Sequence, residues 1–132
     1  MKNLSLLCLL AVLVMAAKCG TSVQLPKEVY GKTWLYSYEE DSADVRTYRP
    51  NTYDFPASRG RTGFLVKEDG TFMNYAIAPT DGLEEQPGKW TAQGKNIILV
   101  ELEGSNRPPQ TLEIVSATPT VIKIKRKSAE EQ

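Results

Sequence analysis

Apolar and polar residues alternate with a period of two along much of the chain after Gly31. In the first such stretch Trp34, Tyr36 and Tyr38 fall on one side, and Leu35 falls on the other. This alternation is the pattern of a β-strand with one buried face. The sequence therefore predicts a strand that begins just after Gly31.

Further β-rich runs follow at the spacing of short strands joined by tight turns. They are predicted over residues 62–67, 71–78, 89–92, 96–102, 111–117 and 121–127. Asp69-Gly70 separates the first two of these runs, and Asp-Gly between alternating apolar runs is a strong hairpin signal. Gly or Pro interrupts every window that could form a long amphipathic helix, so we expect an all-β chain.

A chain of short antiparallel strands removes its unpaired edges by closing into a barrel. We therefore predict a small antiparallel up-and-down barrel, in a single domain over residues 32–127. The apolar pairs expected to point inward are Phe64 with Val66, Leu112 with Ile114, and Ile122 with Ile124. Residues 40–61 are weakly patterned and rich in Pro, Ser and Arg, and we predict an ordered loop over one end of the barrel. Residues 128–132 are expected to fray.

The first 18 residues have the pattern of an export signal. Lys2 gives a positive start, an apolar stretch runs from Leu4 to Met15, and Ala16-Ala17 place small residues near a cleavage site. The apolar stretch is shorter than the ~20 residues of a spanning helix. We predict a signal peptide over residues 1–18, followed by a polar tether over residues 19–31.

Cys19 follows this segment directly, at the position where bacterial lipoproteins carry the cysteine that is acylated. Two alternatives stay open: acylation of Cys19, and ordinary cleavage after Ala16 or Ala17. Cys8 lies inside the apolar stretch, so the exported chain keeps a single cysteine and forms no internal disulfide. In either case we expect an exported protein of the periplasm or cell envelope, or else a secreted one. Contact with a membrane is expected only through a lipid on Cys19.

Composition narrows the function. The 132 residues hold 16 Lys+Arg against 16 Asp+Glu, no His and two Cys. A chain without a basic excess does not fit nucleic-acid binding. The lack of His excludes Ser-His-Asp and Cys-His catalysis and His-ligated metals. Adjacent carboxylates in runs 39–41 and 84–85 would point to opposite faces of a strand, so they do not form a catalytic pair. We therefore expect a non-enzymatic protein without a cofactor or metal.

Several short motifs occur in an order that resembles the small exported lipocalin-like proteins of bacteria, which are barrels of the calycin type. They are Gly31 with Trp34, Tyr48-Arg49-Pro50, the run 55–61 (FPASRGR), Phe64, the run 69–72 (DGTF), the run 78–81 (APTD) and Gly88-Lys89-Trp90. The resemblance covers nearly all of residues 31–127. It implies an eight-stranded barrel whose interior holds one small apolar ligand.

Two arginines are the candidate charged groups of a binding site. Arg59 and Arg61 flank Gly60, and in an extended stretch their side chains would leave on one face. Paired guanidinium groups bind a carboxylate or phosphate head group, with Tyr48 as a further donor. The alternative is an ion-pair network with Asp81, Glu84 or Glu85 that fastens the long loop to the barrel.

Aromatic side chains are the candidate lining of the barrel interior. The ligand-binding candidates among them are Trp34, Tyr36, Tyr48, Phe72 and Trp90. An eight-stranded barrel has an interior that side chains just fill or that holds one small ligand. The sequence leaves two functions open: a binding protein for a small hydrophobic or amphipathic ligand, and an envelope protein-interaction module with a filled barrel. The second predicts that residues 40–61 form the surface that binds a protein partner.

Overall fold

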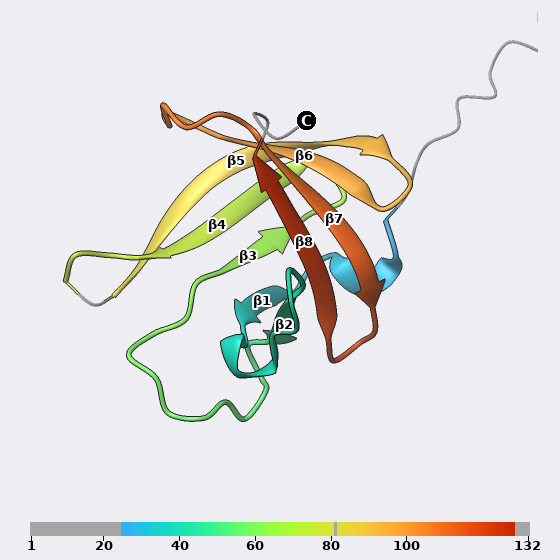
Figure 1. The fold of residues 1–132 in the computed structure, drawn as a ribbon. Helices are drawn as coiled ribbons and strands as arrows, with labels where there is room; N and C mark the ends of the chain where they lie inside the picture. The colour runs from blue at the N-terminus through green and yellow to red at the C-terminus, as the bar shows by residue number, and fades with distance from the viewer. Residues whose placement is uncertain (1–24, 81, 129–132) are drawn as a thin grey trace, which may run out of the picture.

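The computed structural model describes residues 25–80 and 82–128, which form an antiparallel barrel of eight strands (Figure 1). The elements are η2 (Lys27–Val29), β1 (Thr33–Tyr36), η3 (Tyr38–Glu40), β2 (Arg46–Pro50), β3 (Gly63–Val66), β4 (Thr71–Ile77), β5 (Leu83–Gly94), β6 (Ile97–Leu102), β7 (Gln110–Ala117) and β8 (Ile122–Ser128). The only helices among these residues are the short 3₁₀ turns η2 and η3, so the predicted all-β class and closed barrel are confirmed. Within the described ranges, no helix has the length and apolar character needed to cross a membrane. The predicted signal peptide, Cys19 and residues 129–132 lie outside the described residues.

The strand order around the barrel is β1-β2-β8-β7-β6-β5-β4-β3. Strands β3 to β8 follow one another as an up-and-down meander, as predicted. The first three strands depart from that order, because β1 lies between β2 and β3 and pairs antiparallel with both. Strands β2 and β3 are therefore parallel to each other, and residues 51–62 connect them in a long loop that bulges away from the body of the barrel (Figure 1). The two ends of the loop bond to the two ends of β1, Asn51 to Thr33 and Thr62 to Tyr36.

Gly63 permits this arrangement. Leu35 of β1 pairs with Arg49 on one side and with Gly63 on the other. A Cβ atom at residue 63 would lie 2.1 Å from the backbone oxygen of Trp34, closer than any real contact. Strand β3 thus approaches β1 at a distance that only glycine allows.

Strand β2 lies inside the region that we predicted to be a loop, so the loop prediction is wrong for Arg46–Pro50. The strand carries one large apolar residue, Tyr48, whose side chain is buried in the core beside the buried Thr47. Pairing with β1 and β8 stabilises it, with Tyr48 opposite Tyr36 and Ile122. Tertiary pairing forms this strand without a hydrophobic alternation along its own sequence.

The predicted turn at Asp69-Gly70 is confirmed between β3 and β4. Gly70 has a φ of +92°, and the Asp69 carboxylate accepts hydrogen bonds from the amide and hydroxyl of Thr71 at 3.0 and 2.6 Å. The next hairpin is longer than expected, because β5 begins at Leu83 rather than at Lys89. The first part of β5 projects with β4 beyond the body of the barrel (Figure 1), so its residues are mostly exposed and show no strand-like alternation.

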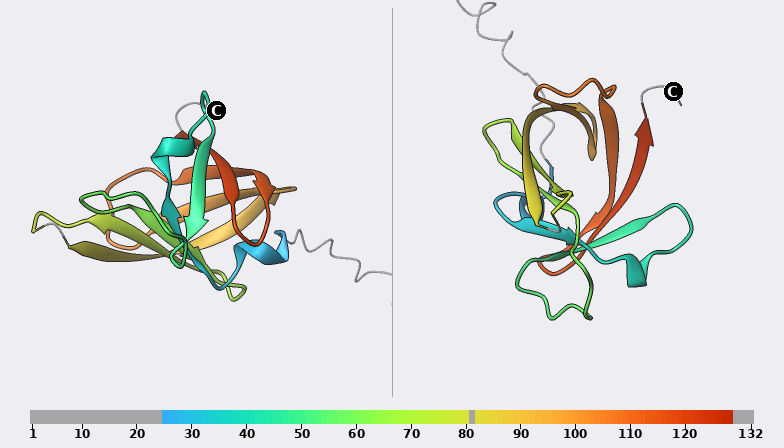
Figure 2. Two further views of the ribbon diagram at one scale, coloured as in Figure 1. Left: turned by 90° about the horizontal axis from the view of Figure 1, so that it is seen from below. Right: turned by 90° about the vertical axis from the view of Figure 1, so that its left-hand side faces the viewer.

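One end of the barrel is closed by apolar side chains. Leu25 and Val29 are buried beside Trp34, whose indole N–H donates to the Val29 carbonyl at 3.0 Å. Leu25 lies just before η2 and Val29 is its last residue, and both belong to the segment, residues 19–31, that was predicted as a tether. The inward pairs predicted from the sequence are all buried: Phe64, Val66, Leu112, Ile114, Ile122 and Ile124. The views in Figure 2 show the strands curving around this core.

Candidate functional site

A cavity of about 90 Å³ lies inside the barrel, toward the end opposite Leu25 and Val29. Its walls come from β4, β6, β7 and β8, and the loop between β6 and β7 covers it. The apolar lining is Phe72, Val100, Leu102, Pro108 and Leu112. The polar lining is Asn74, Ser105, Arg107, Gln110 and Arg126. The interior is thus filled at one end and hollow at the other, and the hollow has both apolar and polar side chains in its lining.

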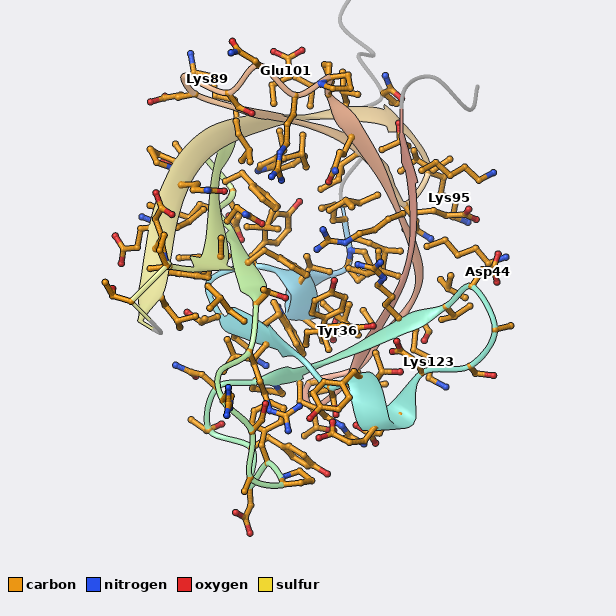
Figure 3. The ribbon with its side chains drawn as sticks, turned by 60° about the vertical axis from the view of Figure 1, so that its left-hand side comes forward. Tyr36, Asp44, Lys89, Lys95, Glu101 and Lys123 are labelled. Carbon is orange, nitrogen blue, oxygen red and sulfur yellow. The ribbon has the colours of Figure 1, made fainter. Side chains whose placement is uncertain are left out.

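The lining follows from the alternation of side chains along each strand. Phe72 and Asn74 are two apart on β4, and Gln110 and Leu112 are two apart on β7, so each pair points inward. The Asn74 side-chain amide donates to the Gln86 side-chain oxygen on β5 at 2.9 Å. This bond holds the Asn74 side chain, which lines the cavity, against the neighbouring strand β5. In Figure 3 Tyr36 lies on the inner side of the strands, whereas Lys89 and Glu101 point outward.

Arg126 is a charged residue of the cavity lining that has an unpaired hydrogen-bond donor. It follows Ile122 and Ile124 at the next inward position of β8 and pairs with Leu112 of β7. Its Nε is buried and has no hydrogen-bond partner among the described residues. The guanidinium carbon lies 5.6 Å from the ring centre of Tyr48. A buried donor without a partner is unfavourable, since it has lost its hydrogen bonds to water.

The predicted ligand-binding aromatics are divided among different surroundings. Phe72 lines the cavity. Trp34 is in the closed end, and Trp90 donates its indole N–H to the Lys67 carbonyl at 2.8 Å and packs on Tyr30. These two rings thus pack away from the hollow part of the interior.

Tyr36 and Tyr48 lie between the closed and hollow parts of the barrel. Their ring centres are 5.4 Å apart, and Tyr48 stacks edge-on against Phe64 at 4.9 Å. The Tyr36 hydroxyl donates a short hydrogen bond to the Asp41 carboxylate. Burial, and next this bond, raise the pKa of Tyr36 to about 12. Tyr36 therefore stays neutral and links β1 to the turn that follows η3.

Arg61 does not face the cavity. Its side chain is buried, and its guanidinium donates to the Glu39 carboxylate at 2.9 and 2.6 Å and to the carbonyls of Tyr36 and Pro56. Hydrogen bonding to Arg61 lowers the pKa of Glu39 below its usual value. Arg59 is exposed, so the two arginines lie in different surroundings and do not form a paired clamp.

The geometry of Arg61 therefore fits the predicted alternative, an ion pair that fastens the long loop to the barrel, but with a different partner. The predicted partners were Glu84, Glu85 and Asp81; the observed partner is Glu39, and Asp81 lies outside the described residues. The register explains the difference. Thr62 bonds to Tyr36 at the end of β1, so Arg61 meets the turn after β1 rather than the β4–β5 hairpin.

Arg49 makes a second bidentate pair in the same region. Its guanidinium donates to the Glu40 carboxylate at 2.9 and 2.6 Å and lies 4.7 Å from the ring centre of Tyr53. Tyr53 packs edge-on against Phe55, and Phe55 lies 4.6 Å from the Arg61 guanidinium. The two rings lie between the two guanidinium groups, and this row fastens residues 51–61 to η3 and β2.

We expect the Arg49–Glu40 pair to make the barrel sensitive to acid. Hydrogen bonding to Arg49 lowers the pKa of Glu40 from 4.5 to about 2. A carboxyl group whose pKa is lower in the folded state stabilises that state above pH 4.5, and the stabilisation disappears as the pH falls toward 2. Urea unfolding at a series of pH values measures this loss.

The matched variant for this measurement is Glu40→Gln, which keeps the shape of the side chain and removes its charge. At neutral pH the variant is expected to be less stable than the native protein. The difference in the free energy of unfolding should shrink as the pH falls through the interval between the two pKa values. A difference that stays constant down to pH 2 would contradict the assignment.

Most of the cavity lining, Arg126 included, was not predicted from the sequence. The signal was present, because Ile122 and Ile124 were assigned to the inner face of their strand. Extending the same alternation by one step places residue 126 inside the barrel. An arginine at an inward position of a strand is unusual, and it indicates a polar site at this end of the interior.

Within residues 25–80 and 82–128, no group of three or more His, Cys, Asp or Glu side chains is arranged to hold a metal ion. The comparisons give no further assignment: no protein-family model, no curated protein and no solved structure matches the chain. The candidate site therefore rests on the geometry of the cavity alone.

Proposed function

We propose that this protein binds a small amphipathic molecule with an anionic group inside its barrel. The observation that carries the proposal is the buried Nε of Arg126, which lacks a hydrogen-bond partner among the described residues and lies beside the cavity. A carboxylate accepts two parallel N–H bonds from a guanidinium group. Such a ligand would satisfy Arg126, and its apolar part would lie against Phe72, Val100 and Leu112.

The size of the cavity limits the ligand. One water needs about 10–15 Å³ of cavity, so 90 Å³ accepts roughly six to nine water-sized groups. A carboxylate with a chain of about six carbons fits this number. A long-chain fatty acid exceeds it unless the β6–β7 loop moves outward.

The proposed setting is the one that the sequence predicts. We propose an exported lipocalin-like protein, free or anchored by a lipid on Cys19, that carries or senses such a molecule outside the cytoplasm. The closed antiparallel barrel of eight strands supports the likeness to lipocalins. This barrel differs from a simple up-and-down meander in one respect, because β1 lies between β2 and β3.

Binding of hexanoate, measured by titration calorimetry, tests the proposal. We expect the native protein to bind hexanoate more tightly than hexanol, because only the acid forms charge-assisted bonds with Arg126. Arg126→Met keeps most of the side-chain volume and removes the charge. It is expected to lower the affinity for hexanoate by about 10- to 100-fold, the value of ~1.5–3 kcal/mol for a charge-assisted hydrogen bond.

Lys127→Met is the matched control, because Lys127 is adjacent on β8 and exposed. It should leave hexanoate binding unchanged. Arg126→Met should also keep or raise the melting temperature, since it removes a buried donor without a partner. Equal affinities of the native protein and Arg126→Met for hexanoate would contradict the proposal. Native mass spectrometry of protein purified from its host would identify the natural ligand.

A protein-interaction module is the second candidate function. The predicted surface for it was the loop over residues 40–61, in which Tyr38 and Tyr53, at its border and within it, are 49% and 38% exposed. Exposed tyrosines beside arginines are common in protein interfaces. Replacing both tyrosines by serine and comparing the proteins captured by each form tests this surface. An unchanged set of partners would count against it.

A further inference from the structure

The first part of β5 has a free edge. Strand β5 pairs with β4 from Leu83 to Lys89, but its pairing with β6 begins only at Gly88. Pro87 has no N–H, and its carbonyl accepts a hydrogen bond from the Glu103 amide at 2.9 Å. Among the described strands, β5 therefore has a partner on one side only between Leu83 and Gln86.

The backbone direction at this edge follows from the neighbouring bonds. The Trp90 amide bonds to Gly70, toward β4, so even-numbered residues of β5 bond to β4 and odd-numbered ones face away. The N–H and C=O groups of Leu83 and Glu85 thus point outward from the β4–β5 hairpin. No described residue forms a backbone hydrogen bond with them. This edge offers the pattern to which another strand can bond.

A groove of about 340 Å³ runs along the same edge, between β5 and the loop after β6. Among the described residues, the carboxylates of Glu84, Glu85 and Glu103 line it together with one cationic side chain, that of Arg107. None of the three carboxylates forms an ion pair among the described residues. The groove is therefore acidic and lies beside unpaired backbone groups.

We propose that the free edge of β5 binds an extended basic segment of another protein, which adds to the hairpin as a further strand. Lysine or arginine side chains of that segment would meet Glu84, Glu85 and Glu103, while its backbone bonds to Leu83 and Glu85. A second copy of this chain fits less well, because like charges on adjacent strands repel each other. The proposal is independent of ligand binding in the barrel interior.

Fluorescence anisotropy with two labelled six-residue peptides tests the proposal: Lys-Lys-Val-Val-Lys-Lys, which places lysine on both faces of an extended strand, and the same peptide with glutamate in place of lysine. We expect the basic peptide to bind and the acidic one not to bind. The double variant Glu84→Gln/Glu85→Gln should weaken binding about fivefold at low salt, as two exposed ion pairs of ~0.5 kcal/mol each allow. Glu68→Gln, in the turn at the other end of β4, should bind like the native protein.

A pair of variants at one position separates strand addition from simple charge attraction. Glu85→Gln and Glu85→Pro both remove the charge, but only proline removes the outward N–H, and the bonds between β4 and β5 do not use that N–H. We expect Glu85→Pro to bind the basic peptide about fivefold more weakly than Glu85→Gln. Equal affinities of these two variants would overturn the proposal.

Amide hydrogen exchange on the native protein gives a test that needs no variant. Added basic peptide should slow the exchange of the Leu83 and Glu85 amides, and leave those of Glu84 and Gln86, already bonded to β4, unchanged. Unchanged exchange at Leu83 and Glu85, equal binding of the acidic peptide, or no binding of the basic peptide at about 1 mM would overturn the proposal.

Discussion

Gly63→Ala is expected to destabilise the barrel by about 3 kcal/mol or more, because a new Cβ would meet backbone rather than a movable side chain. The clash is with the carbonyl oxygen of Trp34, 2.1 Å from the Cβ position. Strands β1 and β3 would have to separate, which breaks the ladder through Leu35. Thermal unfolding followed by circular dichroism measures the loss, and a shift of roughly 10 °C or more is expected for a domain of this size.

Gly82→Ala is the matched control for this substitution. No atom lies within 4 Å of a Cβ built at Gly82, so an added methyl group meets no clash there. The same chemical change is therefore expected to be neutral or to stabilise by about 0.4–1 kcal/mol through the unfolded state. If Gly63→Ala and Gly82→Ala melt at the same temperature, the close approach of β1 and β3 is not a constraint on the fold.

Trp34→Ala is expected to remove about 3–5 kcal/mol of stability, the usual cost of deleting a buried aromatic ring. Trp34 is 0% exposed and packs beneath Leu25 and Val29 at the closed end. The substitution also leaves the Val29 carbonyl without its indole donor. Small domains are stable by about 5–15 kcal/mol in total, so this variant should be partly unfolded at moderate urea concentrations.

Trp90→Ala provides the comparison, since Trp90 is only partly buried and rests against Tyr30 at the surface of the core. It should lose distinctly less stability than Trp34→Ala in the same urea titration. Trp34→Phe should fall between the two, because it keeps most of the packing and loses the hydrogen bond. A larger loss for Trp90→Ala than for Trp34→Ala would show that the closed end is not the centre of the core.

The parts of the fold that the sequence predicted are those in which local pattern and tertiary environment agree. The turn at Asp69-Gly70 and the inward positions of Ile122 and Ile124 follow from chemistry within a few residues. Strand β2 could not be found in this way, because Thr47 and Tyr48 are buried by β1 and β8 rather than by an alternation of their own. The place of β1 in the strand order depends on Gly63, whose role appears only when β1 and β3 are side by side.

The candidate site was predicted less well, for a related reason. Arg61 was predicted as a ligand-binding residue, yet its guanidinium is paired with the carboxylate of Glu39, which is 22 residues away. Arg126 stood out less, although it lies at an inward position of a predicted strand. Whether an arginine is available to a ligand depends on which carboxylates the fold brings near it. That information lies in the register of the strands and not in the spacing of residues along the chain.

The position of β2 also has a consequence for how the chain folds. Strand β2 pairs with β1, its neighbour in sequence, and with β8, in the register of Arg46 with Ile124 and Tyr48 with Ile122. The meander from β3 to β8 forms from hairpins of low contact order, whereas the contact between β2 and β8 closes a loop of most of the domain. The pairing of β2 with β8 therefore requires the last strand, β8, to be in place. The pairing of β2 with β8 joins the first two strands to the end of the meander and so closes the barrel.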